Sequence, residues 1–523
     1  MSTTSVETTD SVAPEQDPIA AVPEVATDST PKDGRATRRA LFTMGAAFAA
    51  AALASPGKAA AQRIVRPHTT RPRPPAPPPG DSLQRLVRRI TNGVTEEEMN
   101  RARSMGFQRY LDYHLRPSSI NDDEVETNVV TRFPSLALDG TGLFQQDQNA
   151  LGNQLAEATM YRAAFSKRQL YERMVHFWTD HFTIYYPKVN YLKLLDDRDV
   201  IRAHALGKFH DMLRASAHSP AMLEYLDNTR SRARSVNQNY AREIMELHTL
   251  GVDGGYTQTD VEEVTRCLTG WTIQGRGVFR FDPSGHDFTE KTVLGRTIAA
   301  MPTSAGAAAI QDGETVLDIL LAHPSTARFI AFKMIRWLLR YDPPPALVDK
   351  VAATFTRTGG DIPAMIRDIL TPANLMAAPA KYRQPYQLVL AAIRAAQPTG
   401  TNFSAISGGQ LRNLGQALFQ WEDPDGWPDN VDWWSGLILQ RWNFCTFITS
   451  QTAGNTPVDV TTLMLVNTPD AIAEALNRRA FAGEMPATLK QQVTAFLAAA
   501  PINANRVREA FALVLSSNAF QWF

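Results

Sequence analysis

Cysteine is scarce in this sequence: only Cys267 and Cys445 occur among its 523 residues. Two cysteines cannot form a disulfide-rich scaffold, and neither has the C-x-x-C spacing of a zinc site or a redox pair. A single disulfide is one interpretation. The helical and aromatic neighbours of the two residues favour the other, in which both are buried free thiols.

An excess of charge of one sign is also lacking. Lysine and arginine together number 53, and so do aspartate and glutamate. Proteins that bind nucleic acid or anionic membranes usually carry a basic surplus, so we expect neither kind of partner. After residue 61 no run of roughly 20 apolar residues occurs, and we therefore expect no stable membrane insertion of the mature chain.

One shorter apolar run lies near the N-terminus. Arg38 and Arg39 stand directly before an uncharged, alanine-rich stretch from Ala40 to Ala54. The small residues that end at Ala61 match the pattern that a signal peptidase reads. Residues 1–61 are therefore predicted to be a twin-arginine signal peptide with a disordered lead-in. The expected location is the periplasm or the cell exterior.

Proline dominates the next segment. Seven of the thirteen residues from Pro67 to Pro79 are proline, and such a tract favours extended polyproline II over a packed core. We interpret residues 62–80 as a proline-rich tether. The folded domain is expected to occupy residues 81–523.

Helical periodicity covers most of that domain. Apolar residues recur at helical spacing in stretches such as Leu151–Ala164, Gln169–Tyr185 and Asn239–Leu250. Strand signals are confined to Trp271–Ile273 and Val278–Phe281, which are joined by a glycine-containing turn. The sequence therefore predicts a mainly α fold: one large multi-helix domain with one small β-hairpin insertion.

Two predicted helices carry polar residues among apolar neighbours. His181 and His248 each fall on an apolar face, and Glu243 and Glu246 form a polar stripe beside His248. A buried imidazole needs a partner, which is a carboxylate, a carbonyl, a metal or another histidine. All four residues are candidate catalytic residues, with His181 and His248 as candidate ligands of a divalent metal. The alternative is a core histidine bonded to a backbone carbonyl; no H-E-x-x-H motif is present.

Two further segments suggest a site. His286 and Asp287 lie in the loop after the predicted hairpin, where they are either catalytic or metal-binding residues or, as the default interpretation, solvated surface residues. A turn-rich acidic segment, residues 421–434, contains four tryptophans. Such indoles either stack on sugar rings or fold back as a lid over the helical core, and we favour the lid.

Several of these segments resemble a bacterial family known as domain of unknown function 1800, which is common among secreted proteins. The resemblance is carried by residues 173–182 (RMVHFWTDHF), 205–209 (ALGKF), 220–227 (PAMLEYLD), 237–251 (NQNYAREIMELHTLG) and 441–444 (RWNF). It implies a helical fold and frequent pairing with a second exported protein of the sulfatase-like superfamily, encoded nearby. It implies no established reaction. Relatives often read Phe-Trp-His-x-His, whereas here Thr179 replaces the first of these histidines and only His181 remains.

Two functions of different classes follow. The first is an exported periplasmic helical protein that acts with an exported partner in envelope or extracellular-polymer biology. The alternative is a metal-assisted or acid/base hydrolase with a His/Glu site between helices. Convergence of His181, Glu243, His248 and His286 in one cleft would favour the hydrolase. Dispersed histidines bonded to backbone carbonyls would favour the first function.

Overall fold

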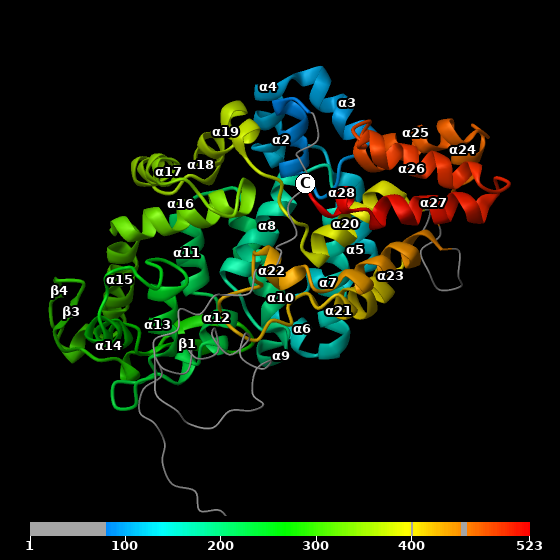
Figure 1. The fold of residues 1–523 in the computed structure, drawn as a ribbon. Coiled ribbons are helices and arrows are strands. Elements are labelled where there is room, and N and C mark those ends of the chain that lie inside the picture. The colour runs from blue at the N-terminus through cyan, green and yellow to red at the C-terminus, as the bar shows by residue number, and fades with distance from the viewer. Residues whose placement is uncertain (1–79, 399–400, 451–457) are drawn as a thin grey trace, which may run out of the picture. The chain divides into compact units, whose positions relative to one another are not determined.

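Helices account for most of the chain, as the apolar periodicity predicts (Figure 1). The computed structural model describes residues 80–398, 401–450 and 458–523, all of which belong to one compact unit, residues 70–523. The predicted signal peptide and all but the last residue of the predicted tether lie outside the described residues. The helices before residue 250 are α2 Ser82–Ile90, α3 Glu96–Met105, α4 Phe107–His114, α5 Asp123–Arg132, α6 Gly140–Phe144, α7 Gln148–Phe165, α8 Gln169–His181, α9 Tyr186–Val189, α10 Leu192–Asp196, α11 Phe209–Ala217, α12 Pro220–Tyr225 and α13 Asn239–Glu246.

The second half of the unit is equally helical. Its helices are α14 Gln258–Cys267, α15 Gln311–Ala322, α16 Pro324–Leu338, α17 Pro345–Thr358, α18 Ile362–Ile369, α19 Pro372–Ala377, α20 Pro385–Ala396, α21 Leu411–Asn413, α22 Val431–Trp434, α23 Ile438–Thr449, α24 Thr461–Met464, α25 Pro469–Phe481, α26 Ala487–Ala498, α27 Ala504–Ser516 and α28 Asn518–Gln521. The short 3-10 and π segments are η1 Pro117–Ser119, η2 Pro134–Ala137, η3 Asp197–Arg202, η4 Asn228–Arg230, η5 Pro283–Gly285, η6 Thr303–Ile310 and η7 Ala405–Gln410. None of these described helices is long and apolar enough to cross a membrane.

The described residues form two antiparallel hairpins. In the first, β1 (Trp271–Gln274) pairs with β2 (Val278–Phe281), so that Trp271 lies opposite Phe281. This is the hairpin that the sequence predicts. The second, between β3 (Lys291–Val293) and β4 (Arg296–Ile298), was not predicted. Its strands have only three residues each, which is too short for a recognisable alternation.

Two large apolar cores hold the helices together. The first includes residues of α2–α4, α8 and α11–α18, and the second includes residues of α5, α7, α20 and α23–α28. Segments far apart in sequence meet within them: α2 contacts α19, and α7 contacts α20. Cys267 lies in the first core and Cys445 in the second, and both are buried free thiols, which confirms the prediction.

Two predicted helices end earlier than their periodicity suggests. The stretch expected to continue α8 to Tyr185 stops at His181, and the stretch expected to reach Leu250 stops at Glu246. In the second case Gly251 follows with a φ of 82°. A Cβ atom there would lie 2.9 Å from the ring of Phe329, so the chain turns closely past α16 and leaves His248 in that turn.

Candidate functional site

His181 and His248 lie side by side in the interior. Their ring centroids are 6.1 Å apart, and each residue is only 1% exposed. The His181 Nε2–H donates to the backbone carbonyl of His248 at 3.1 Å, because a carbonyl oxygen can only accept. The other ring nitrogen of His181, Nδ1, and the Nε2 atom of His248 are buried and have no hydrogen-bond partner among the described residues.

Burial keeps this histidine pair neutral. Burial, followed by the positive charge of Lys333, lowers the pKa of His248 to about 3 and the pKa of His181 well below 6.5. Neutral imidazoles can accept protons or bind a metal. Among the described residues, however, no group of three or more His, Cys, Asp or Glu side chains is placed to hold a metal ion.

The two glutamates of α13 have different surroundings. Glu246 accepts a hydrogen bond from the Tyr256 hydroxyl at 3.0 Å, which ties α13 to the glycine-rich turn that follows it. Glu243 is completely buried. Burial, followed by the negative charges of Asp423 and Glu243, raises the pKa of Tyr225, so the Glu243 carboxylate lies near Tyr225 of α12.

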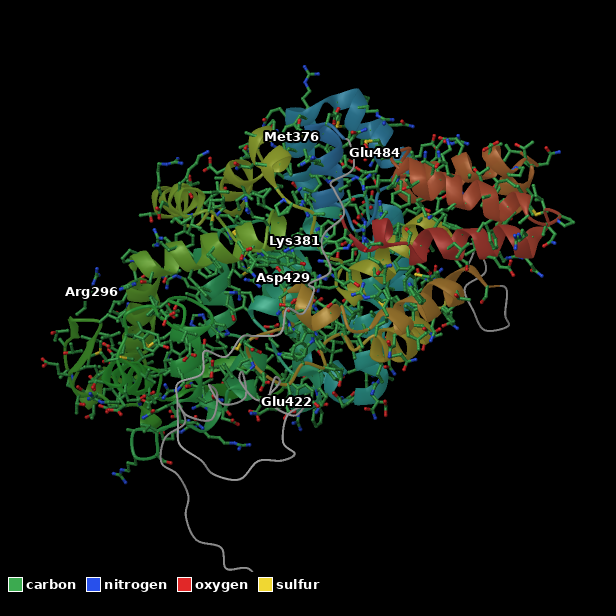
Figure 2. The ribbon with its side chains drawn as sticks, in the orientation of Figure 1. Arg296, Met376, Lys381, Glu422, Asp429 and Glu484 are labelled. Carbon is green, nitrogen blue, oxygen red and sulfur yellow. The ribbon has the colours of Figure 1, made fainter. Side chains whose placement is uncertain are left out.

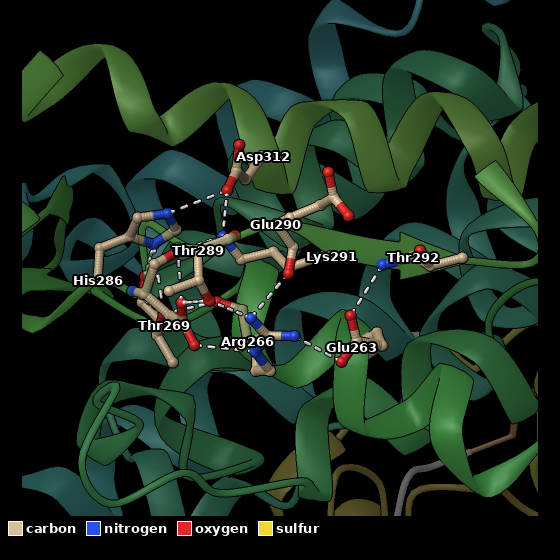
Figure 3. A network of polar contacts seen from close by, with 10 residues as sticks. Glu263, Arg266, Thr269, His286, Thr289, Glu290, Lys291, Thr292 and Asp312 are labelled. Atoms are coloured by element: carbon tan, nitrogen blue, oxygen red, sulfur yellow. Dashed lines mark hydrogen bonds and ion pairs between the residues drawn. The ribbon is translucent and has the colours of Figure 1, made fainter. Parts of the chain in front are cut away.

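His286 belongs to a polar network beneath the second hairpin (Figure 3). The expectation of a solvated loop residue is wrong, because His286 is only 5% exposed. Its Nδ1–H donates to the Thr269 carbonyl at 2.9 Å, and Nε2 lies 3.2 Å from Oδ2 of Asp312. Both ring nitrogens therefore face acceptors, and the ring offers no free nitrogen to a substrate or metal.

Asp287 and Lys291 complete this network. The Arg266 Nε–H donates to Oδ2 of Asp287 at 2.9 Å. Burial raises the pKa of Asp287, but hydrogen bonds from Arg266 and Thr289 outweigh that effect and lower it overall. The buried Lys291 ammonium donates to Asp312 at 2.6 Å and so joins β3 to α15. These contacts give His286 and Asp287 a structural role in the hairpin.

Lys333 is the residue that sequence reasoning missed. It is half-buried on α16, and desolvation lowers its pKa to about 8 despite the opposing charges of Asp180 and Asp425. The same ammonium lowers the pKa of His181 and His248. We call these five side chains the Lys333 cluster: Asp180, His181, His248, Lys333 and Asp425. The cluster thus contains two predicted site residues, His181 and His248, and three residues that were not predicted as site residues.

Helix α8 carries a further histidine, His176, next to the Lys333 cluster. His176 precedes Asp180 by one helical turn, and its Nε2 lies 3.5 Å from Oδ2 of Asp180. Both atoms are buried without a hydrogen-bond partner among the described residues. Burial lowers the pKa of His176 to about 3 and raises that of Asp180 well above 3.8. The spacing of His176 and Asp180 was visible in the sequence, but the proximity of Asp180 to Lys333 was not.

The tryptophan-rich loop, residues 421–434, folds back over the end of α8. Gly426 has a φ of 79°, and a Cβ atom there would lie 2.2 Å from the Asp180 carbonyl oxygen. At one end the Tyr225 hydroxyl donates to the Glu422 carbonyl at 2.6 Å, and at the other the Lys381 ammonium donates to Asp429 at 2.8 Å. Figure 2 labels Glu422, Lys381 and Asp429. The loop therefore lies where the lid interpretation places it.

The tryptophans of this loop differ in how far they are exposed to solvent. Trp434 is 1% exposed, and its indole donates to the Pro428 carbonyl at 2.7 Å. Trp421 and Trp427 pack together with ring centroids 4.5 Å apart. Trp433 differs, because 54% of it is exposed. The ring of Trp433 nevertheless contacts Trp421 and Trp434, so all four indoles pack with one another and Trp433 is the most exposed of them.

Comparison with known proteins places the chain in a family without giving it a reaction. A family model described as "Protein of unknown function (DUF1800)" matches residues 85–522, which is most of the chain. No curated protein and no solved structure matches. The protein therefore belongs to the DUF1800 family.

Proposed function

We propose that this protein is exported by the twin-arginine route and works in the periplasm or outside the cell, together with a second exported protein. The paired Arg38 and Arg39 before the uncharged run Ala40–Ala54 support export. The resemblance to secreted relatives supports a sulfatase-like protein as the partner. Envelope or extracellular-polymer biology is the expected setting.

The contacts of the predicted catalytic residues favour a binding function over a catalytic one. Four of the six predicted catalytic residues make contacts that hold the fold. Of these four, His181 bonds a backbone carbonyl and Glu246 bonds Tyr256. His286 and Asp287 lie within the hairpin network. Side chains that are engaged in this way are poorly placed to act on a substrate, and this supports a role in binding.

Export is tested by a conservative double substitution. Replacing Arg38 and Arg39 with lysine keeps the charge but removes the paired arginines that the route reads. We expect the variant to stay in the cytoplasm with its N-terminal segment uncleaved, as cell fractionation and intact-mass analysis would show. Arg71→Lys with Arg73→Lys, in the predicted tether, is the matched control. Equal export of the paired-arginine variant would refute the proposed route.

A hydrolase is the second candidate, and the Lys333 cluster favours it. Desolvation raises the pKa of Asp180 and lowers the pKa of His181 and of His248, so a carboxyl group and two imidazoles with shifted pKa values share one neighbourhood. In this hypothesis the histidines are bases or ligands of a divalent metal. Of the other predicted catalytic residues, Glu243 and Glu246 remain candidates in this hypothesis, whereas His286 and Asp287 hold the hairpin network.

Elemental analysis separates the two candidates. The mature protein would be purified without chelators, alongside its His181→Ala and His248→Ala variants. Stoichiometric metal that is lost in both variants would establish a site and favour the hydrolase. A metal-free wild-type protein would exclude the metal-assisted form of the hydrolase and favour the binding function. In the acid/base form of the hydrolase, Asp180→Asn should abolish turnover of any substrate found.

A further inference from the structure

A cavity of about 340 Å³ lies between α5 and α7, two helices that pack against each other (Figure 1). Polar contacts hold its walls together. The Arg162 guanidinium of α7 donates to Glu126 of α5 at 2.9 Å, and the Ser166 hydroxyl donates to Asp122 at 2.5 Å. The volume is near the lower end of the roughly 300–1,000 Å³ that small-molecule sites occupy, so the cavity suits one unit of a larger molecule.

Several polar side chains line this cavity without partners of their own. Among the described residues, the side chains of Glu124, Asn128 and Lys167 make no hydrogen bond or ion pair. Arg132 also has no ion-pair partner there; its guanidinium carbon lies 5.1 Å from the centre of the Tyr161 ring. Polar groups that meet at one cavity and are not used by the fold are available to a ligand.

A larger cavity, of about 420 Å³, differs in this respect. Its charged side chains already have partners. Arg198 pairs with Asp199 at 2.7 Å, and the buried Asp196 pairs with Lys193 at 2.7 Å. A ligand in the larger cavity would have to displace these contacts. The cavity between α5 and α7 is therefore the better candidate for a binding site.

Three aromatic rings form the apolar side of the smaller cavity. The ring centroids of Tyr161 and Phe165 are 5.0 Å apart, and each lies 5.8 Å from that of Phe403. Tyr161 and Phe403 are buried, but 37% of Phe165 is exposed. The face of an aromatic ring is electron-rich, so it attracts the C–H groups of a sugar ring. Sugar hydroxyls both donate and accept hydrogen bonds, which suits the unpaired amide and carboxylate nearby.

The charges of the cavity favour an anionic sugar. Arg132 and Lys167 supply two cations without ion-pair partners among the described residues, whereas Glu124 supplies one such carboxylate. The other lining carboxylate, Asp122, already accepts hydrogen bonds from the Ser166 hydroxyl and from the Lys167 backbone N–H. The groups that are free to bind thus carry one net positive charge. Guanidinium and ammonium groups form strong charge-assisted hydrogen bonds with carboxylate and sulfate oxygens.

We propose that the cavity between α5 and α7 binds a sugar unit that carries a carboxylate or sulfate group, as part of an acidic extracellular polysaccharide. The ring of Phe165 stacks on the sugar, and Arg132 and Lys167 hold its anionic group. Glu124 and Asn128 bind its hydroxyls. This inference rests on the proposed function, which places the protein where such polymers occur, and it adds the class of ligand and its site.

Isothermal titration calorimetry of the full mature chain tests the site. The anionic probes are oligogalacturonate and a sulfated gluco-oligosaccharide, and the tighter of the two identifies the anionic group. The same gluco-oligosaccharide without sulfate is the neutral probe, and poly-glutamate is the anionic probe that lacks a sugar. We expect an anionic sugar to bind at least about tenfold more tightly than either of these two.

Substitutions then locate the site. Arg132→Gln and Lys167→Gln should each weaken binding of the anionic sugar at least about tenfold, and Phe165→Ala should weaken it through loss of stacking. Arg103→Gln and Arg109→Gln are the matched controls, because they remove exposed arginines that do not line the cavity. Arg132 and Lys167 are exposed as well, so their variants should fold, and thermal melting would verify this.

Each outcome has a distinct meaning. Binding that Arg132→Gln, Lys167→Gln and Phe165→Ala leave unchanged would overturn the site. Equal affinity for the neutral sugar or for poly-glutamate would overturn the class of ligand, and so would a wild type that binds neither anionic sugar. These results leave export untouched, because substitution of Arg38 and Arg39 tests it separately. Retention of the wild type in the cytoplasm would refute the proposed function even if the anionic sugar binds.

Discussion

Replacing His248 with glutamine should make the protein less sensitive to acid. Burial, followed by the charge of Lys333, lowers the pKa of His248 to about 3, whereas an unfolded chain has a histidine pKa near 6.5. Between these two values the unfolded chain binds a proton at this position and the folded chain does not. Stability from the neutral ring is therefore fully present above pH 6.5 and is lost as the pH falls towards 3.

The size of the effect follows from the separation of the two pKa values. Linkage predicts that protonation of His248 in the unfolded chain costs the wild type about 2 kcal/mol of unfolding free energy between pH 7 and about pH 5. Glutamine does not titrate, so His248→Gln escapes this cost. The stability deficit of the variant at pH 7 should therefore shrink by about 2 kcal/mol at about pH 5.

Urea unfolding followed by tryptophan fluorescence at several pH values measures both proteins. Their difference cancels the titration of every group that they share, including Asp180, whose raised pKa acts in the opposite direction. A stability difference that is constant with pH would refute the view that His248 is buried as a neutral ring.

Two further substitutions test contacts that position the site. Gly426→Ala should displace the tryptophan-rich loop, because the added methyl group would meet the Asp180 carbonyl. We expect the tryptophan fluorescence emission of this variant to shift to longer wavelength. Gly436→Ala is the control: a methyl group there would meet open space, so the spectrum should not change. Asp312→Asn should lower the unfolding free energy by about 3 kcal/mol, because it leaves the buried Lys291 ammonium without its counter-ion. Chemical denaturation would measure that loss, and a stable Asp312→Asn variant would show that backbone carbonyls suffice for Lys291.

Only some of the candidate site residues could be recognised from the sequence. His181 and His248 were recognisable because each interrupts an apolar face, and the structure places their rings 6.1 Å apart. His286 was misjudged as a solvated loop residue, because the partner that buries it, Asp312, comes from α15 and not from the loop. Lys333 gave no signal at all, since a lysine on an amphipathic helix is ordinary until its surroundings are known.

The sequence by itself determined the helical class, the first hairpin and the family, because periodicity, turn residues and motifs are local properties of the chain. It favoured two free thiols but left a disulfide open, which the structure excludes. Only the tertiary structure decided which ionisable side chains lie close to one another. Asp180, His248, Lys333 and Asp425 come from four segments that are distant in sequence, and their pKa shifts arise mainly from desolvation and from one another's charge. Desolvation and charge proximity depend on packing in three dimensions, and no local pattern in the sequence records them.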